Sequence, residues 1–194
     1  LDKGSQVDLS EGNLGVSWSS NSGHAVRSSF TVSSGKWYAE FRRGVSSVTI
    51  GIAKQNNTGV SASSGWIGSS AYRSGGSYSY SSDANKYTNG SDTSYGASYA
   101  SGDIIGVAYD ADNGTIEFFK DGSSQGQAYS GISGEFAFGI GFFGGTTGGQ
   151  IAIANFGQDS SFAGTETATS NSDANGNGTF HSAVPSGFLA LCSD

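Results

Sequence analysis

Short runs in which apolar residues recur at every second position are the main pattern along this chain. Residues 37–42 and 48–53 both show this period of two, which is typical of a strand with one face toward a core. The run from Asp103 to Tyr109 is nearly all apolar, as in a strand that is buried on both faces. Helix-period patterns are weak throughout, so the chain predicts an all-β fold.

A later run has an unusual split of side-chain sizes. Residues 136–142 carry phenylalanine or isoleucine at the even positions and only alanine or glycine at the odd positions. A glycine-rich face in a strand often marks a place where another backbone approaches closely. We therefore expect a strand here whose small face lies against another segment. Residues 151–156 predict one more strand.

Turn residues separate these runs. Asp112-Asn113-Gly114 lies between two apolar runs, and Asn-Gly is the strongest short hairpin signal. Asp121-Gly122 ends the next run, and residues 144–149 predict a glycine-rich loop. The acidic residues before Gly114 resemble the start of a calcium loop, but a strand pattern follows where such a loop would continue. We predict a hairpin and no metal site.

Three stretches have little pattern: residues 1–15, 55–100 and 157–183. A chain of 194 residues suits one β domain. We predict a lead-in segment or a linker from a longer chain over residues 1–15 and one β-sandwich domain over 16–194. The chain contains no Met and starts at Leu1, so we expect a processed chain or a fragment of a longer one.

Charge excludes some partners. Charged residues make up 13% of the chain, the net charge is −7, and Lys and Arg number nine. Such a chain has no basic stripe to neutralise phosphates, so we predict no nucleic-acid partner and no binding to anionic membranes. No stretch has the length and apolarity of a membrane span, and no signal peptide is recognisable, so we predict no membrane insertion.

Motifs for catalysis are absent from the sequence. The two histidines, His24 and His181, stand in no recognisable catalytic motif. The single cysteine, Cys192, lies in an apolar run, where a buried hydrophobic role is expected. We predict no enzymatic activity, no cofactor and no metal. Arg42 and Arg43 are expected to pair across strands with a glutamate, Glu40 or Glu117.

Six segments, in this order, resemble the strands and hairpins of the SPRY family: Gly35–Phe41, Val48–Ala53, Gly102–Asp110, Asn113–Gly122, Phe136–Ile140 and Asn155–Gly157. The resemblance spans about residues 15 to 158. It implies a bent antiparallel β-sandwich of the SPRY, concanavalin-like jelly-roll class. It also implies a non-catalytic binding module that holds its partner with loops at one end. In this family Asp103 is expected to make a structural hydrogen bond to nearby backbone.

The end of the chain carries a second resemblance. Residues 184–192 look like the terminal strand of SPRY-like domains in phage-encoded virion and tail proteins. This resemblance implies a location on the virion surface, outside the cell.

Candidate ligand-binding residues come from residues 55–100, where aromatic rings stand among Ser, Gly and Asn. This mixture resembles that of antibody paratopes, and Tyr and Trp combine an apolar ring with a polar group. We predict a ligand site formed by Trp66, Tyr72, Arg73, Tyr78 and Tyr87.

The same aromatic residues could instead be structural. For Trp66, Tyr72 and Tyr87 a surface role and a core role remain open. One of Tyr78 and Tyr80 is expected to face the core. Tyr95 is expected to be structural, as are the core tryptophans Trp18 and Trp37. A second candidate surface is formed by residues 143–149 with 157–180, which could equally be plain connectors.

Three functions are compatible with these features. The first is a phage fibre, spike or capsid decoration that recognises a glycan or protein on the host surface. The second is a structural virion protein that cements neighbouring virion subunits, for which a homotrimer is the expected assembly. The third is a cellular SPRY adaptor that holds a peptide.

Overall fold

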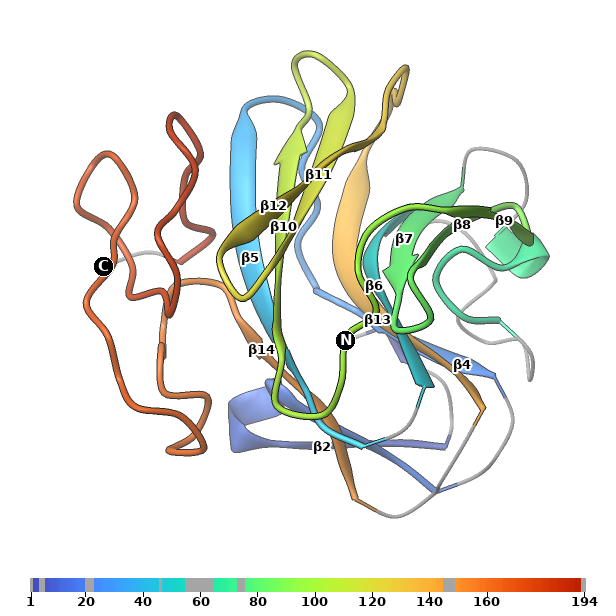
Figure 1. The fold of residues 1–194 in the computed structure, drawn as a ribbon, viewed down its shortest axis with the longest axis horizontal. Helices are drawn as coiled ribbons and strands as arrows, with labels where there is room; N and C mark the ends of the chain where they lie inside the picture. The colour runs from blue at the N-terminus through green and yellow to red at the C-terminus, as the bar shows by residue number, and fades with distance from the viewer. Residues whose placement is uncertain are drawn as a thin grey trace.

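Two antiparallel β-sheets lie face to face (Figure 1). The computed structural model describes residues 2–3, 6–19, 23–45, 47–54, 65–72, 76–144 and 149–192. Apart from the strands, these residues form two short 3-10 turns, η1 (Glu11–Asn13) and η3 (Ser70–Tyr72). No helix in this described part is long and apolar enough to cross a membrane. The all-β sandwich expected from the sequence is confirmed.

The first sheet contains seven of the described strands. In spatial order they are β1 (Asp2–Lys3), β4 (His24–Arg27), β13 (Phe136–Gly144), β6 (Ser47–Lys54), β7 (Ser77–Ser81), β8 (Asn85–Thr88) and β9 (Ser91–Ser94). β9 forms one edge of this sheet.

The second sheet also contains seven described strands. Its order is β12 (Ser123–Tyr129), β11 (Thr115–Lys120), β10 (Ile104–Asp110), β5 (Lys36–Arg43), β14 (Gln150–Asn155), β3 (Gly15–Trp18) and β2 (Val7–Ser10). Every residue of β10 is buried, which confirms the prediction from its continuous apolar run. Residues 1–15, expected as a lead-in segment or linker, supply β1, β2 and η1, and Val7 is fully buried.

The core fills the space between the two sheets and consists largely of aromatic and β-branched side chains. Phe118, Phe136 and Phe138 are fully buried there. Trp18 is buried as predicted, while Trp37 is only partly buried and packs at the edge of the core. The Trp37 indole N–H donates a hydrogen bond of 2.7 Å to the Ser34 carbonyl.

The small face of β13 is covered by a segment from far away in the sequence. Residues 65–69 cross it, and Ile67 is buried against this outer side of the sheet. A Cβ atom at Gly141 would lie only 2.4 Å from the Ile67 backbone nitrogen. One at Gly139 would lie 3.2 Å from the Ile67 Cδ1 atom. The expected close approach of another backbone is confirmed.

The predicted hairpins are also present. β10 and β11 pair in antiparallel register around the turn that contains Gly114, whose φ is +63°. The Asp110 carboxylate accepts hydrogen bonds from the Asn113 backbone N–H, at 2.9 Å, and side-chain amide, at 2.8 Å. The Asp103 carboxylate accepts the Ala100 backbone N–H at 2.7 Å. These acidic residues therefore have structural partners, as expected.

The C-terminal segment (residues 156–192) lies on the outer side of the second sheet, next to β5 (orange to red in Figure 1). The strand expected over residues 184–192 is not there. A single parallel bridge joins Leu189 to Trp37, because β14 ends opposite Glu40 and leaves the start of β5 open on that side. Cys192 is half-buried and packs on the cluster that contains Phe180.

A buried carboxylate anchors this segment. Glu40 has no exposed surface. Its carboxylate accepts the backbone N–H groups of His181 and Ser182, both at 2.8 Å. The Tyr38 hydroxyl at 3.3 Å and the Asn155 amide at 3.4 Å also donate to it. Burial raises the pKa of Glu40, while the two backbone donors act to lower it.

The cross-strand pairing expected for the two arginines is wrong. Arg42 pairs with Glu166, whose Oε1 lies 2.6 Å from the Arg42 Nε atom. Arg43 donates to the Tyr99 carbonyl and lies over the Tyr99 ring. The Glu40 carboxylate is used instead by the C-terminal segment, whose His181 and Ser182 backbone N–H groups it accepts.

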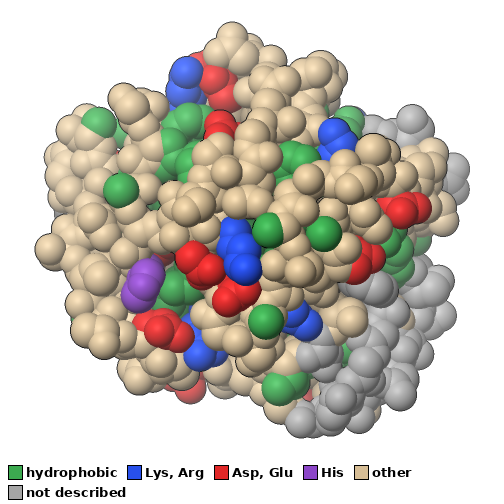
Figure 2. Space-filling view, viewed as in Figure 1, with side chains coloured by type: hydrophobic (Ala, Val, Ile, Leu, Met, Phe, Trp, Pro, Cys, Tyr) green, Lys and Arg blue, Asp and Glu red, His purple; other side chains and the backbone are tan. Residues whose placement is uncertain are grey.

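The surface reflects the low content of charged residues. On the face shown in Figure 2, neutral polar side chains and backbone dominate, and the acidic and basic side chains occur singly or in small groups.

Candidate functional site

Strand alternation divides the predicted ligand residues between the two sides of the first sheet. Tyr80 is fully buried and faces the core, which confirms that one member of the Tyr78–Tyr80 pair is structural. Tyr78 points the same way and is half-buried, with its ring centre 5.0 Å from that of Tyr129 and 5.9 Å from that of Phe136. Tyr78 therefore lies on the inner side, and a ligand contact for it stays a prediction.

Trp66 and Tyr87 come together on the outer side. Tyr87 lies opposite Ser79 in the β7–β8 register, and Ser79 is covered by the segment that contains Trp66, because its hydroxyl donates to the Ile67 carbonyl at 2.8 Å. The rings of Trp66 and Tyr87 meet edge to face, with centres 5.1 Å apart and planes at 83°. Both are half-buried. We call this pair the aromatic corner.

Two other predicted ligand residues are described only in part or not at all. Tyr72 ends the η3 turn, and its side chain lies outside the described part of the structure. Arg73 lies outside the described residues altogether.

The remaining tyrosines of this region are structural. Tyr95 packs edge-on against Tyr80, with ring centres 5.2 Å apart, as expected for a structural residue. Tyr99 is buried, and its hydroxyl lies 3.2 Å from the Val48 carbonyl oxygen and 3.0 Å from that of Tyr80. Burial raises the pKa of Tyr80 and of Tyr95 to about 12, so both hydroxyls stay protonated.

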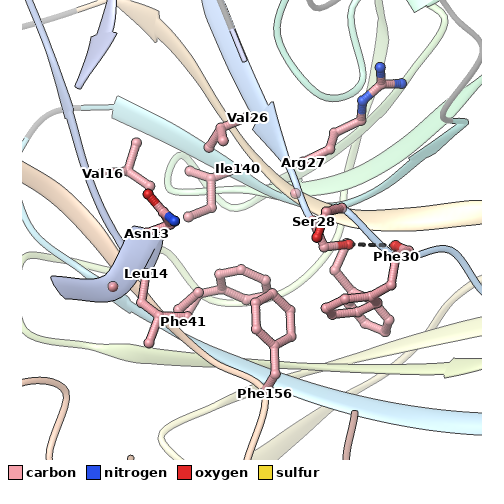
Figure 3. A pocket seen from close by; sticks show the side chains of 15 residues that line it. Asn13, Leu14, Val16, Val26, Arg27, Ser28, Phe30, Phe41, Ile140 and Phe156 are labelled. Atoms are coloured by element: carbon pink, nitrogen blue, oxygen red, sulfur yellow. Dashed lines mark hydrogen bonds between the residues drawn. The ribbon is translucent and has the colours of Figure 1, made fainter. Parts of the chain in front are cut away.

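A second feature, which the sequence did not predict, is an apolar pocket between the two sheets (Figure 3). Its volume is about 230 Å³. Its apolar walls come from both sheets and from the loops at one side of the sandwich: Leu14, Val16, Val26, Phe30, Phe41, Phe138, Ile140, Ala154 and Phe156.

Four phenylalanine rings line this pocket: Phe30, Phe41, Phe138 and Phe156. The Phe156 ring centre lies 5.1 Å from that of Phe30, 6.0 Å from that of Phe41 and 6.4 Å from that of Phe138. All three pairs meet edge to face, which is a favourable aromatic geometry. Phe41 and Phe138 are buried, whereas Phe30 and Phe156 are half-buried and reach the surface. The pocket therefore opens from the core to solvent.

The rim of the pocket is polar and neutral. Gly12 and Asn13 of η1 line it on one side, and Ser28 and Ser29 on the other. The Ser28 hydroxyl donates to the Phe30 carbonyl at 2.8 Å. Arg27 also borders the pocket, but its side chain turns away (Figure 3) and donates to the Lys54 carbonyl.

Three consecutive residues on one side of this rim have a left-handed backbone conformation. Glu11, Gly12 and Asn13 all have positive φ angles, of 50°, 65° and 74°. A left-handed conformation is unfavourable for residues other than glycine, costs on the order of 1–3 kcal/mol each and is common at ligand-binding sites.

The volume and the walls decide what this pocket can take. At about 230 Å³ it is smaller than the roughly 300–1,000 Å³ typical of small-molecule sites. The walls offer no charged group to a ligand. The arrangement therefore suits one uncharged apolar side chain, whose full burial contributes about 1.5–3 kcal/mol.

The described residues contain no candidate metal site. Within the described residues, no three His, Cys, Asp or Glu side chains gather closely enough to hold a metal ion. His24 is buried next to Trp18, with ring centres 6.2 Å apart, and burial lowers its pKa.

The comparisons with known proteins agree on the family. The SPRY domain model matches residues 36–159, more than half of the chain. Among solved structures, the SPRY domain of human HERC1 superimposes with a TM-score of 0.63. The two chains are 19% identical, and the match covers 76% of this chain and 91% of that one. No curated protein sequence matches the chain. SPRY domains are in general non-catalytic binding modules. The chain belongs to the SPRY domain family.

Proposed function

We propose that this domain binds a protein partner by taking one apolar side chain of that partner into the pocket between the sheets. The pocket itself carries the proposal, since four phenylalanine rings line it and two of them, Phe30 and Phe156, reach its opening to solvent. Buried apolar anchors in well-packed pockets supply most of the binding energy in many interfaces.

The neutral rim supports the same function. Asn13, Ser28 and Ser29 can exchange hydrogen bonds with the backbone on either side of an inserted side chain. Desolvation of a charged side chain would oppose association, and no charged side chain of the rim has to lose water on binding. A partner segment with one Leu, Ile, Met or Phe among neutral residues fits these requirements.

A selection from a library of short random peptides tests this function directly. We expect the selected peptides to share one apolar residue with neutral neighbours. Ala154 lines the pocket and is almost fully buried, so Ala154→Phe should fill it and reject these peptides. Ala183→Phe adds the same side chain at an exposed position of the C-terminal segment and should bind them like the parent chain.

Two outcomes contradict the proposal: a library that yields no binder, or peptides that bind Ala154→Phe as tightly as the parent chain. Leu14→Ala guards against the case in which the filled variant does not fold. It enlarges the pocket and should shift the selection toward tryptophan.

The biological setting is a prediction from the sequence alone. We propose a phage virion surface, where a fibre, spike or capsid decoration would recognise a host-surface protein or glycan. A cellular SPRY adaptor fits the fold equally well. An antibody against the domain, applied to purified phage particles and to lysates of uninfected cells, separates the two settings.

A structural role that cements virion subunits is the remaining alternative. It predicts a stable homotrimer of the full-length protein in light scattering, whereas a monomer would contradict it.

A further inference from the structure

The outer face of the β8–β9 hairpin presents a defined set of side chains. In the register of this hairpin, Tyr87 lies opposite Asp92 and Asn85 lies opposite Ser94. Because side chains alternate along a strand, these four share the face that also holds the aromatic corner. The intervening Lys86 lies on the opposite face.

Contacts on the inner face confirm that Lys86 is turned away. Its Nζ atom donates to the Ala128 carbonyl at 2.6 Å and lies 5.1 Å from the centre of the Tyr129 ring. The outer face of the hairpin therefore carries the Asp92 carboxylate and no lysine of its own.

Hydrogen bonds hold the polar groups of this face in fixed orientations. The Tyr87 hydroxyl donates to Asp83 Oδ2 at 2.8 Å, and the Asn85 backbone N–H donates to Asp83 Oδ1 at 3.1 Å. The Asn85 side-chain amide donates to Asp92 Oδ2 at 3.3 Å. Each carboxylate oxygen can accept more than one hydrogen bond, so both exposed carboxylates keep acceptor capacity toward solvent.

The aromatic corner adds an apolar surface beside these acceptors. Two rings that meet at 83° form a floor and a wall. The C–H face of a sugar ring can pack on such a surface, while its hydroxyl groups donate to the adjacent carboxylates and amide.

We propose that Trp66, Tyr87, Asp83, Asn85 and Asp92 form a glycan-binding site for neutral sugars or amino sugars. Two carboxylates repel sialic and uronic acids at this site. A protein partner is less suited to it, because its carboxylates would have to be desolvated. This site is separate from the pocket between the sheets and does not depend on it.

A glycan array probed with the full chain tests the proposal, followed by NMR titration with N-acetylglucosamine, glucosamine, mannose and sialyllactose. We expect binding of neutral or amino sugars, no binding of sialyllactose, and shifts at the amides of β8 and β9. Tyr87→Ala and Asp92→Asn should each weaken binding by about tenfold or more. Asp92 is exposed, so its variant should fold normally.

Thr93→Ala is the matched control, since Thr93 neighbours Asp92 on the same strand but lies opposite Lys86, on the other face. It should bind sugars like the parent chain. The proposal is overturned if no sugar binds at about millimolar concentration, if sialylated glycans are preferred, or if Tyr87→Ala and Asp92→Asn bind as well as the control. The proposal would also be overturned if a random peptide without sugar displaced the bound sugar from this face. Ala154→Phe should leave sugar binding unchanged, which keeps this test distinct from that of the pocket.

Discussion

The β7–β9 region and the C-terminal segment are both rich in small polar residues, yet different interactions fix them. In β7–β9, backbone ladders set the strands, and alternation sends tyrosines to opposite sides of the sheet. The C-terminal segment forms no strand, only isolated bridges such as that between Leu189 and Trp37. Besides scattered backbone hydrogen bonds, acidic side chains of the segment itself and of β5 hold its backbone.

Glu40 and Asp173 show how carboxylates replace a ladder. Glu40 accepts two backbone N–H groups of the segment. Asp173 accepts the backbone N–H groups of Asn175, Asn177 and Ala190, at 2.9, 2.9 and 3.0 Å. A polar sequence can therefore be structural where a buried carboxylate organises it, and a tyrosine-rich sequence can present a surface where its strand leaves one face open.

The largest effect is expected at Glu40. Glu40→Ala leaves the part-buried N–H groups of His181 and Ser182 and the buried Tyr38 hydroxyl without this acceptor, so we expect the free energy of unfolding to fall by about 3–5 kcal/mol. Urea denaturation measures the loss, and hydrogen exchange should show the His181 and Ser182 amides losing protection first. Glu166→Gln removes only the half-exposed pair with Arg42 and should cost less than about 1 kcal/mol. Equal losses in the two variants would contradict the anchoring role.

The next effect tests how tightly residues 65–69 cover the first sheet. Gly141→Ala places a Cβ 2.4 Å from the Ile67 nitrogen, so the covering segment has to move. Overpacking of this kind costs about 1–3 kcal/mol. Thermal unfolding measures this loss of stability. The control is Ser94→Ala, at an exposed strand position. A glycine such as Gly131 is not used as the control, because its φ of 72° would itself be strained by alanine. A stability unchanged by Gly141→Ala would show that the segment is not in close contact.

Asp173 predicts a dependence on pH. Burial acts to raise the pKa of this carboxyl, but backbone donors led by Ala190 and Asn177 lower it below its ordinary value of 3.8. Its contribution to stability is therefore present above that value and is lost as the pH falls through the lowered folded-state pKa. Asp173→Asn should cost about 1–2 kcal/mol at pH 7. In urea denaturation at decreasing pH, the difference between parent and variant should shrink below pH 3.8; a constant difference would contradict it.

The smallest effect is expected at the aromatic corner. Burial raises the pKa of Tyr87, and the hydrogen bond to Asp83 raises it further, so the hydroxyl is protonated and donates at neutral pH. Because Asp83 is exposed and water can replace the donor, Tyr87→Phe should change stability by only about 0.5 kcal/mol. Tyr80→Phe, which removes the part-buried hydrogen bond to the Ala97 carbonyl, should cost more. Chemical denaturation measures the loss of stability in each variant. A larger loss for Tyr87→Phe than for Tyr80→Phe would contradict the assignment of Tyr80 to the core face and Tyr87 to the outer face.

Much of the sandwich followed from local pattern alone. The period of two over residues 37–42, the apolar run before Asp110 and the turn at Gly114 are properties of neighbouring residues, so the strands and hairpins could be predicted from the sequence. The close contact of another segment with Gly141 was also predictable, because a glycine-rich strand face often marks a place where another backbone approaches closely.

What lies against that face, and where the pocket opens, only the tertiary structure decided. The walls of the pocket come from β3, β4, β5, β13 and β14 together with Phe30 and Phe156, which lie outside the strands. The two backbone donors to Glu40, His181 and Ser182, lie 141 and 142 residues away in the chain. Side-chain alternation fixes which residues share a face, but which distant segments meet depends on how the two sheets pack, and no short sequence pattern records that.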